Sequence, residues 1–144
     1  MGLLSMFRSE APAKKASDDV LLLHTMLLMA GADGYLDQGE VEAVEAYFTQ
    51  LPEFKGKQFQ DVYAEARKLV ARYSNLRESV KSLSGFSSEK VRKKAFVLAA
   101  DLAMASGDVS ESEDELLTAM QRILEIDDGT VQKVLDVLSM KYAR

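Results

Sequence analysis

The apolar residues of this chain recur at the three- and four-residue spacing of α-helices, and nothing in the pattern predicts a pair of strands. The first helix is expected to open at Ser17 or Asp18. It is expected to stop at Gly34, a residue suited to the left-handed conformation at a helix C-terminus. Apolar side chains cover most sides of this helix, so we expect it to be buried in the core.

Each later helix is bounded by a capping or a terminating residue. Residues 37–40 have the form of a capping box and predict a second helix, which runs to about Leu51 because Pro52 ends it. A second capping box over residues 110–113 predicts another helix start. Further helices are expected over 58–73, 76–85 and 88–107, with a last one after Asp127 and Asp128.

The two tight turns share one pattern at an offset of 73 residues, which pairs Gly34 with Gly107 and Glu40 with Glu113. Such self-similarity is typical of one supersecondary unit used twice. We therefore predict an all-α fold, a single helical domain of about six to seven helices over residues 17–144. In it, two helix–tight turn–helix repeats are related by a pseudo-twofold axis. Residues 1–16 are expected to form a flexible N-terminal tail.

Composition narrows the classes of function. A chain of 144 residues with 47% hydrophobic content can bury a sizeable core without disulfides. The absence of Cys removes thiol nucleophiles and cysteine-based metal sites, and it fits a cytoplasmic location. The net charge of -5 argues against nucleic acid as a partner, because phosphate binding requires a basic surface.

The charges are unevenly distributed along the chain. Residues 16–54 and 95–121 contain no Lys or Arg, whereas residues 55–94 carry eleven bases against four acids. If the two acidic segments meet in space, the molecule has an acidic and a basic side. Charged faces of this kind predict a protein partner, which could be an acidic protein or a second copy of the chain.

The beginning of the chain is apolar but carries no recognisable targeting signal. It lacks the basic region and cleavage site of a signal peptide, so secretion is not indicated. The longest apolar run, residues 20–32, is too short to span a bilayer. Membrane contact is therefore expected only as peripheral association, through Leu3, Leu4, Met6 and Phe7.

No catalytic constellation is evident, so we expect that the protein is not an enzyme. The sequence has no glycine-rich phosphate loop and no nucleophile elbow. His24 is the single histidine and lies among leucines, which predicts a hydrogen-bonded core residue rather than a metal ligand.

Two short segments carry a resemblance to a known family. They are Ala32-Asp33-Gly34-Tyr35-Leu36-Asp37-Gln38-Gly39-Glu40 and Ala105-Ser106-Gly107-Asp108-Val109-Ser110-Glu111-Ser112-Glu113. Each resembles the turn of the tellurite-resistance TerB family, in which a small residue, Asp and Gly precede an aliphatic residue, a capping residue and a Glu. The resemblance covers roughly residues 17–144. The second copy departs from the pattern, because Ser106 stands where the first has Asp33 and the acid is displaced to Asp108.

The resemblance implies a cytoplasmic bacterial module connected with stress or tellurite resistance. It also implies that acidic residues at the turns bind a divalent cation. Similar domains occur attached to chaperone-type or membrane-associated modules. The function predicted on this basis is weak binding of a divalent cation, of a protein partner, or of both. The alternative is a protein interaction adaptor that needs no metal.

Six carboxylates near the turns are the candidate metal ligands: Asp33, Asp37, Glu40, Asp108, Glu111 and Glu113. Oxygen ligands of this kind suit calcium or magnesium. Helix capping alone explains Asp37, Glu40 and Glu113. The metal hypothesis therefore depends on the other three, and it expects Asp33 and Asp108 to approach each other. An EF-hand is excluded, because Tyr35 and Val44 stand where that loop requires ligands.

Asp101 is an acid within an apolar helix, and the sequence leaves two interpretations open. It lies on the same strip as Ala105, seven residues before Asp108, so it could extend the acidic turn. It could instead pair with a base from residues 55–94.

Overall fold

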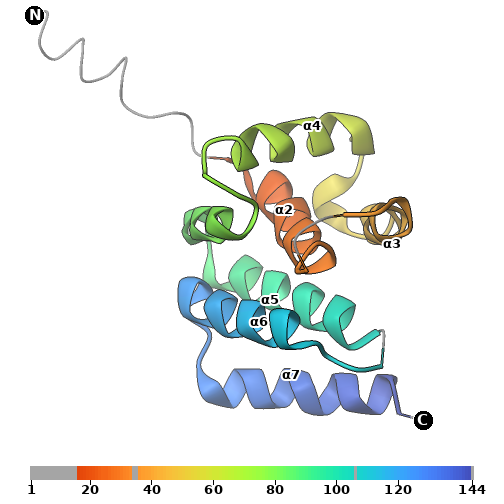
Figure 1. Cartoon of the computed structure of the whole chain (residues 1–144), viewed down its shortest axis with the longest axis vertical. Helices are drawn as coiled ribbons and strands as arrows, with labels where there is room; N and C mark the ends of the chain where they lie inside the picture. Colours follow the sequence, from red (N-terminus) through yellow and green to blue (C-terminus); the bar gives the residue numbers. More distant parts are fainter. Residues whose placement is uncertain (1–15, 34–35, 106, 144) are drawn as a thin grey trace, which may run out of the picture.

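The computed structural model describes residues 16–33, 36–105 and 107–143. Within these ranges the chain is helical and forms no strand, which confirms the predicted all-α class (Figure 1). The predicted tail, residues 1–16, lies outside the described residues except for Ala16. The α-helices are α2 (Asp18–Ala30), α3 (Gln38–Phe48), α4 (Phe59–Val70), α5 (Glu89–Ala105), α6 (Glu111–Leu124) and α7 (Asp128–Lys141), and two 3₁₀ helices are η1 (Pro52–Phe54) and η2 (Arg77–Gly85).

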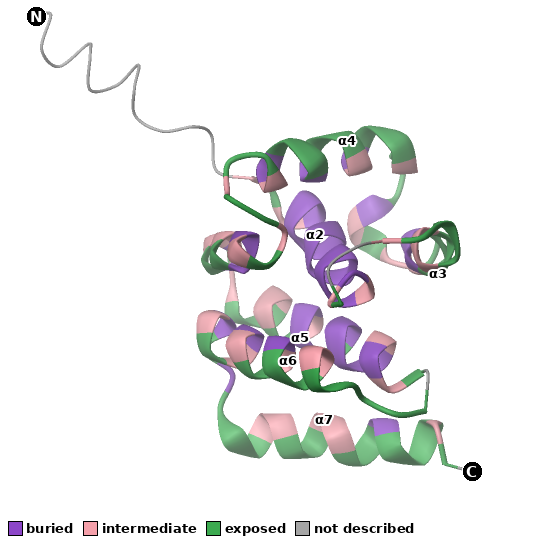
Figure 2. Cartoon of the chain, viewed as in Figure 1, coloured by how far each residue is buried: buried purple, intermediate pink, exposed green. Residues whose placement is uncertain are grey.

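Helix α2 is the centre of the fold. Every residue from Asp19 to Met29 is buried, as the apolar run predicted (Figure 2). It packs against α5 on one side and against α3, α4 and η2 on the others. Burying a Leu or Met side chain stabilises the fold by about 1.5–3 kcal/mol each, so this one helix contributes much of the core. The buried hydroxyl of Thr25 has a hydrogen-bond partner within α2, because Oγ1 donates to the Leu21 carbonyl at 2.7 Å.

The chain builds two halves of similar plan. In the first half α3 and α4 pack on α2, and in the second half α6 and α7 pack on α5. Figure 1 shows α2 between the upper helices and the α5–α6 layer, with α7 outermost. Helices α3 and α6 begin at residues 38 and 111, so the predicted offset is reproduced in the local structure. The pseudo-twofold axis stays a prediction.

Two predicted helix ends were wrong. Helix α2 ends at Ala30 rather than at Gly34, with Gly31 as its C-cap. A Cβ at Gly31 would lie 3.0 Å from Leu76 Cδ2 and 3.1 Å from Leu36 Cγ, so the close approach of these two side chains favours a glycine at this C-cap. Helix α3 ends at Phe48 rather than near Leu51, because the chain turns into η1.

The segment 77–85 is a 3₁₀ helix, which the apolar spacing alone did not distinguish from an α-helix. Its serine hydroxyls bond to carbonyls three residues earlier. Ser82 Oγ donates to the Ser79 carbonyl at 2.7 Å, and Ser84 Oγ donates to the Lys81 carbonyl at 3.2 Å. Such side-chain bonds compete with the α-helical ladder, and they favour the tighter winding here.

His24 is a buried core histidine, as predicted. Its Nε2 lies 3.3 Å from the Ser79 carbonyl, which can only accept, so Nε2 carries the proton. Nδ1 has no hydrogen-bond partner within the described part of the chain. Burial lowers the pKa of His24 to about 4, against a smaller opposite effect of the Ser79 carbonyl. The imidazole is therefore neutral at physiological pH.

Candidate functional site

Of the acids in the first turn, Asp37 and Glu40 cap helix α3, whereas Asp33 is exposed to solvent. Asp37 is the N-cap of α3, and its side chain accepts from the Glu40 amide at 2.8 Å. Glu40 returns the contact by accepting from the Asp37 amide at 3.0 Å. Asp33 lies beyond the end of α2 and is exposed. Two of the three predicted ligands in this turn thus stabilise the start of α3.

The second turn repeats the arrangement with Ser110 in place of Asp37. Ser110 Oγ accepts from the Glu113 amide at 3.1 Å, and Glu113 accepts from the Ser110 amide at 2.8 Å. Asp108 and Glu111 are both exposed. The predicted capping roles of Glu40 and Glu113 are therefore confirmed in both halves.

A small cleft of about 230 Å³ lies between the first turn and α6 of the second half. Asp33 lines it together with Arg77 of η2 and Ser112 of α6. Arg77 donates to Glu115 of α6 at 2.7 Å, so a base stands between the two acidic segments. Among the described residues, no group of three or more acidic or imidazole side chains is placed to hold a metal ion. The calcium or magnesium site stays a prediction.

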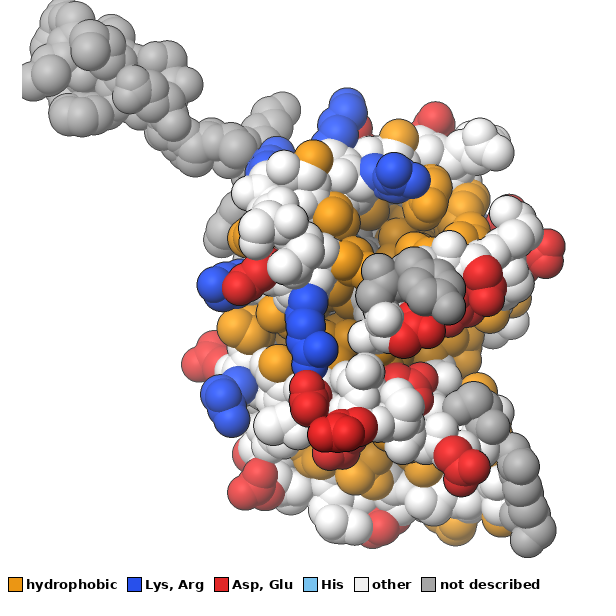
Figure 3. Space-filling model, in the orientation of Figure 1, with side chains coloured by type: hydrophobic (Ala, Val, Ile, Leu, Met, Phe, Trp, Pro, Cys, Tyr) orange, Lys and Arg blue, Asp and Glu red, His pale blue; other side chains and the backbone are white. Residues whose placement is uncertain are grey.

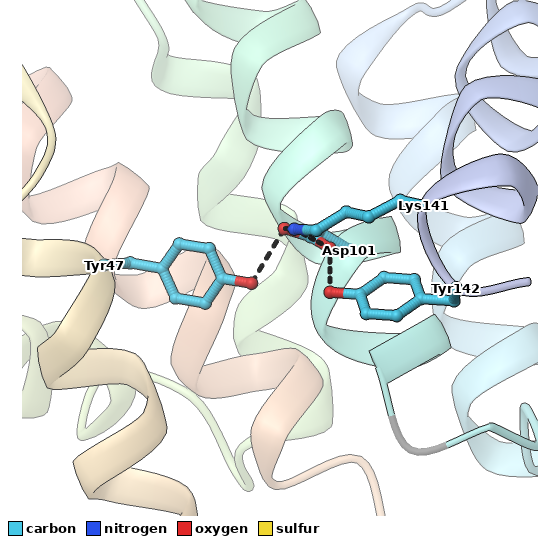
Figure 4. A network of polar contacts seen from close by, with 4 residues as sticks. All are labelled: Tyr47, Asp101, Lys141 and Tyr142. Carbon is cyan, nitrogen blue, oxygen red and sulfur yellow. Dashed lines mark hydrogen bonds and ion pairs between the residues drawn. The ribbon is translucent and has the colours of Figure 1, made fainter.

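Asp101 of α5 is the centre of a polar network that joins three helices (Figure 4). Tyr47 of α3 donates to Oδ2 at 2.8 Å, and Lys141 of α7 lies 3.0 Å from both carboxylate oxygens. Tyr142 donates to Oδ1. We call these four residues the Asp101 network. The base is Lys141, so pairing with a base from residues 55–94 was wrong for this acid.

The chemistry of the Asp101 network indicates a structural anchor. Burial by itself would raise the pKa of the Asp101 carboxyl, but hydrogen bonds from Tyr142, Tyr47 and Lys141 outweigh it and lower the pKa. Burial first, and then the Asp101 carboxylate, raises the pKa of Tyr47. The carboxylate therefore stays ionised and the Tyr47 phenol stays protonated, which is the state in which Tyr47 can donate its hydrogen bond to Asp101.

An apolar furrow separates α3 from α4. Both helices pack on α2 but make little contact with each other, and a hollow of about 620 Å³ lies between them. Its floor includes Leu27 of α2 and Leu76, and its walls include Val41 of α3 with Tyr63 and Val70 of α4. We call this hollow the α3–α4 furrow.

The polar residues of the α3–α4 furrow lie mainly at its edges. Asp37 and Gln38 contribute from the start of α3, and Arg67 contributes from α4, with its guanidinium 5.8 Å from the centre of the Tyr63 ring. One helical turn further along both helices a second hollow is lined by Glu45 and Phe59. The furrow itself is lined by the stretch from Tyr63 to Ala71, about 12 Å along the axis of α4.

Sequence reasoning did not identify the furrow. Its signal was present in α4, where the apolar stripe is wider than the core requires. Val62, Ala66 and Leu69 are buried, whereas Tyr63 and Val70 on the edge of the same stripe are half-buried. When the apolar stripe of a helix is wider than the surface that neighbouring helices cover, the remainder is an exposed apolar surface to which a partner can bind.

Charge is segregated over the surface. On the face drawn in Figure 3, acidic side chains predominate over α3 and α6, and basic side chains predominate over α4 and η2. The α3–α4 furrow lies at the boundary, with an acidic helix on one side and Arg67 on the other. No helix among the described residues is both long enough and apolar enough to cross a bilayer.

Comparison with known proteins gives one result. A family model described as tellurite resistance protein TerB matches residues 20–135, which include both turns and the α3–α4 furrow. No curated protein and no solved structure matches the chain.

Proposed function

Because this chain belongs to the tellurite resistance protein TerB family, we propose that it is a protein interaction adaptor whose α3–α4 furrow binds an amphipathic helical segment of a partner. The observation that carries this proposal is the furrow itself, an open and largely apolar hollow between two helices that make little contact with each other. A helix laid in a groove is a recurrent mode of peptide recognition.

The dimensions favour a helical segment over a compact small molecule. The furrow shares Leu76 with the cleft at Asp33, and a separate hollow lies at Phe59 near the start of α4. The α4 lining runs from Tyr63 to Ala71, about 12 Å, which is long enough for side chains at i, i+3, i+4 and i+7 of a bound helix. The edge residues Asp37 and Arg67 differ in charge, so they can fix the direction of the partner.

This adaptor needs no metal. One carboxylate oxygen of each of Asp37, Glu40 and Glu113 accepts a backbone hydrogen bond at a helix start. The acids of α3 serve instead as a charged border of the furrow, where they would attract a partner that carries bases beside its apolar face. The proposal also requires no catalytic group.

A defined probe tests this function. We would use a synthetic helical peptide of about 14 residues, with Leu on one face and Lys on the other, and follow its binding by fluorescence anisotropy. We expect saturable binding that Val70→Glu weakens at least tenfold, because the new carboxylate enters the apolar trough. Val137→Glu is the matched control on α7, where the side chain is 58% exposed. Equal affinity for the two variants and the parent protein would overturn the proposal.

The same assay separates the adaptor from the cation alternative. Affinity should be the same after chelator treatment and after addition of calcium or magnesium. Backbone amide shifts during a calcium titration give a second measurement. Saturable shifts confined to the turns near Asp33 and Asp108, together with calcium-dependent peptide binding, would favour the cation-dependent function instead.

A further inference from the structure

We propose that the α3–α4 furrow is occupied in the free protein by residues 3–8 of the same chain. The proposal rests on the proposed function, because it treats the furrow as a seat for a helical segment. It adds a ligand of known sequence, Leu3-Leu4-Ser5-Met6-Phe7-Arg8. The segment would act as an internal competitor that a partner must displace.

The pattern of the segment fits the furrow. Leu3, Met6 and Phe7 are spaced i, i+3 and i+4, which places them on one face of a helical turn with Leu4 at its flank. Ser5 lies on the opposite face. An aromatic and three unbranched or γ-branched side chains in five residues are the anchors that apolar grooves between helices accept.

The length and path of the chain also fit. Ala16 lies beside α4, in a hollow lined by Glu65, Lys68 and Arg72. The furrow lies against the other flank of the same helix, where Tyr63, Arg67 and Val70 are exposed to it. A helix with its side chains is about 10–12 Å across. The seven residues from Ser9 to Lys15 span up to about 23 Å when extended, so they can cross the end of α4.

Charge selects the furrow over the nearer hollow. Residues 1–15 carry three bases, Arg8, Lys14 and Lys15, against one acid, Glu10. The hollow beside Ala16 is lined by Lys68 and Arg72 against one acid, Glu65, which pairs with Lys68, so Arg72 leaves its lining with one net positive charge. The α3 side of the furrow offers Asp37 at its edge, and α3 contains three Glu and no Lys or Arg. Attraction across this edge favours the far flank of α4.

A spin label tests the location directly. The chain has no Cys, so Ser5→Cys gives one labelling site, and its place opposite the apolar face keeps a nitroxide out of the furrow. We expect the label on the full-length chain to broaden the amide signals of Val41, Ala66 and Ala71. The amides of α7 should be unaffected. Broadening that is strongest at Ser17 and Val20, which line the hollow beside Ala16, or on α7 would overturn the proposal.

Two controls define what the broadening means. The label on a chain that also carries Leu4→Asp and Phe7→Asp should leave the furrow amides sharp, and unchanged broadening would overturn the proposal. A mixture of labelled, unenriched chain with unlabelled, ¹⁵N-enriched chain should show no broadening. Broadening in the mixture would place the segment in the furrow of a second copy and overturn binding within one chain.

The helical peptide probe then separates this proposal from the proposed function. The Leu4→Asp, Phe7→Asp protein should bind the peptide roughly fivefold or more tightly than the parent, because the competing segment is removed. Equal affinities would overturn occupation by the segment. If the label locates the segment in the furrow but neither protein binds the peptide, the proposal that residues 3–8 occupy the furrow is supported and the proposed adaptor function is contradicted.

Discussion

The two halves of the molecule follow one plan but hold their last helices by different chemistry. Helix α4 packs on α2 and helix α7 packs on α5. An aromatic cluster anchors α4 at its start, where Phe59 packs against Phe48 with ring centres 5.4 Å apart and Phe48 stacks on Phe54 at 4.3 Å. The Asp101 network anchors α7 at its end. A shared arrangement of helices does not imply shared determinants of stability.

The difference has a consequence for function. The aromatic cluster joins the start of α4 to Phe48 at the end of α3, and elsewhere the two helices make little contact, so the α3–α4 furrow lies between them. The polar anchor links α7 to α3 as well as to α5, because Tyr47 of the first half donates to Asp101. The binding surface that we propose therefore belongs to the half held by apolar contacts, while the polar network joins the two halves.

The largest effect is expected from Phe54→Ala, which removes the apolar anchor. Phe54 is 2% exposed and stacks on Phe48. Loss of a buried aromatic side chain leaves a cavity, so the free energy of unfolding should fall by about 4 kcal/mol. Urea denaturation measures it. Tyr63→Leu, at the half-buried edge of the same cluster, is the matched control and should cost less than about 1.5 kcal/mol; equal costs would contradict a buried anchor.

Acid should weaken the first half before the second. The pKa of His24 is lowered to about 4 in the folded state from an ordinary 6.5. Stability from its neutral form is therefore full above pH 6.5 and is lost as the pH falls toward 4, in total about 3 kcal/mol.

Chemical denaturation between pH 7 and pH 4 measures this loss, and His24→Leu should flatten the profile in that range. The pKa of Asp101 is lowered from 3.8, so its contribution is lost only below that value. A parent protein whose stability is constant from pH 7 to pH 4 would contradict the buried neutral imidazole.

Asp101→Asn weakens the Asp101 network, which anchors α7, while it keeps the size and shape of the side chain. The amide cannot accept from two phenols and an ammonium as the carboxylate does, so the free energy of unfolding should fall by about 2 kcal/mol. The loss should couple to Tyr47. In a double-mutant cycle, Tyr47→Phe should have a smaller effect in the Asp101→Asn background than in the parent. Additive effects would show that the network does not join the halves.

The smallest effect is expected from Lys141→Met. The Lys141 side chain is 53% exposed, although it lies 3.0 Å from Asp101. Solvent screens such a pair, so removal of the charge should lower the free energy of unfolding by less than about 1 kcal/mol. Denaturation at low and at high salt measures the pair. A cost equal to that of Asp101→Asn would assign the anchor to the ion pair instead of the phenols.

The sequence by itself determined the features that depend on neighbouring residues. Helix spacing, the two capping boxes at Asp37 and Ser110, and the burial of α2 all follow from residues within a few positions of each other, and the structure has them as predicted. The same local logic identified both turns and hence the family.

Only the tertiary structure decided the features that join distant segments. Leu76 packs closely against Gly31 at the end of α2, and the partners of Asp101 come from α3 and α7. The α3–α4 furrow exists because two helices that both pack on α2 diverge. Local propensity fixes each helix within a few residues, whereas the angle between two helices and the partner of a buried carboxylate are set by packing across the whole core.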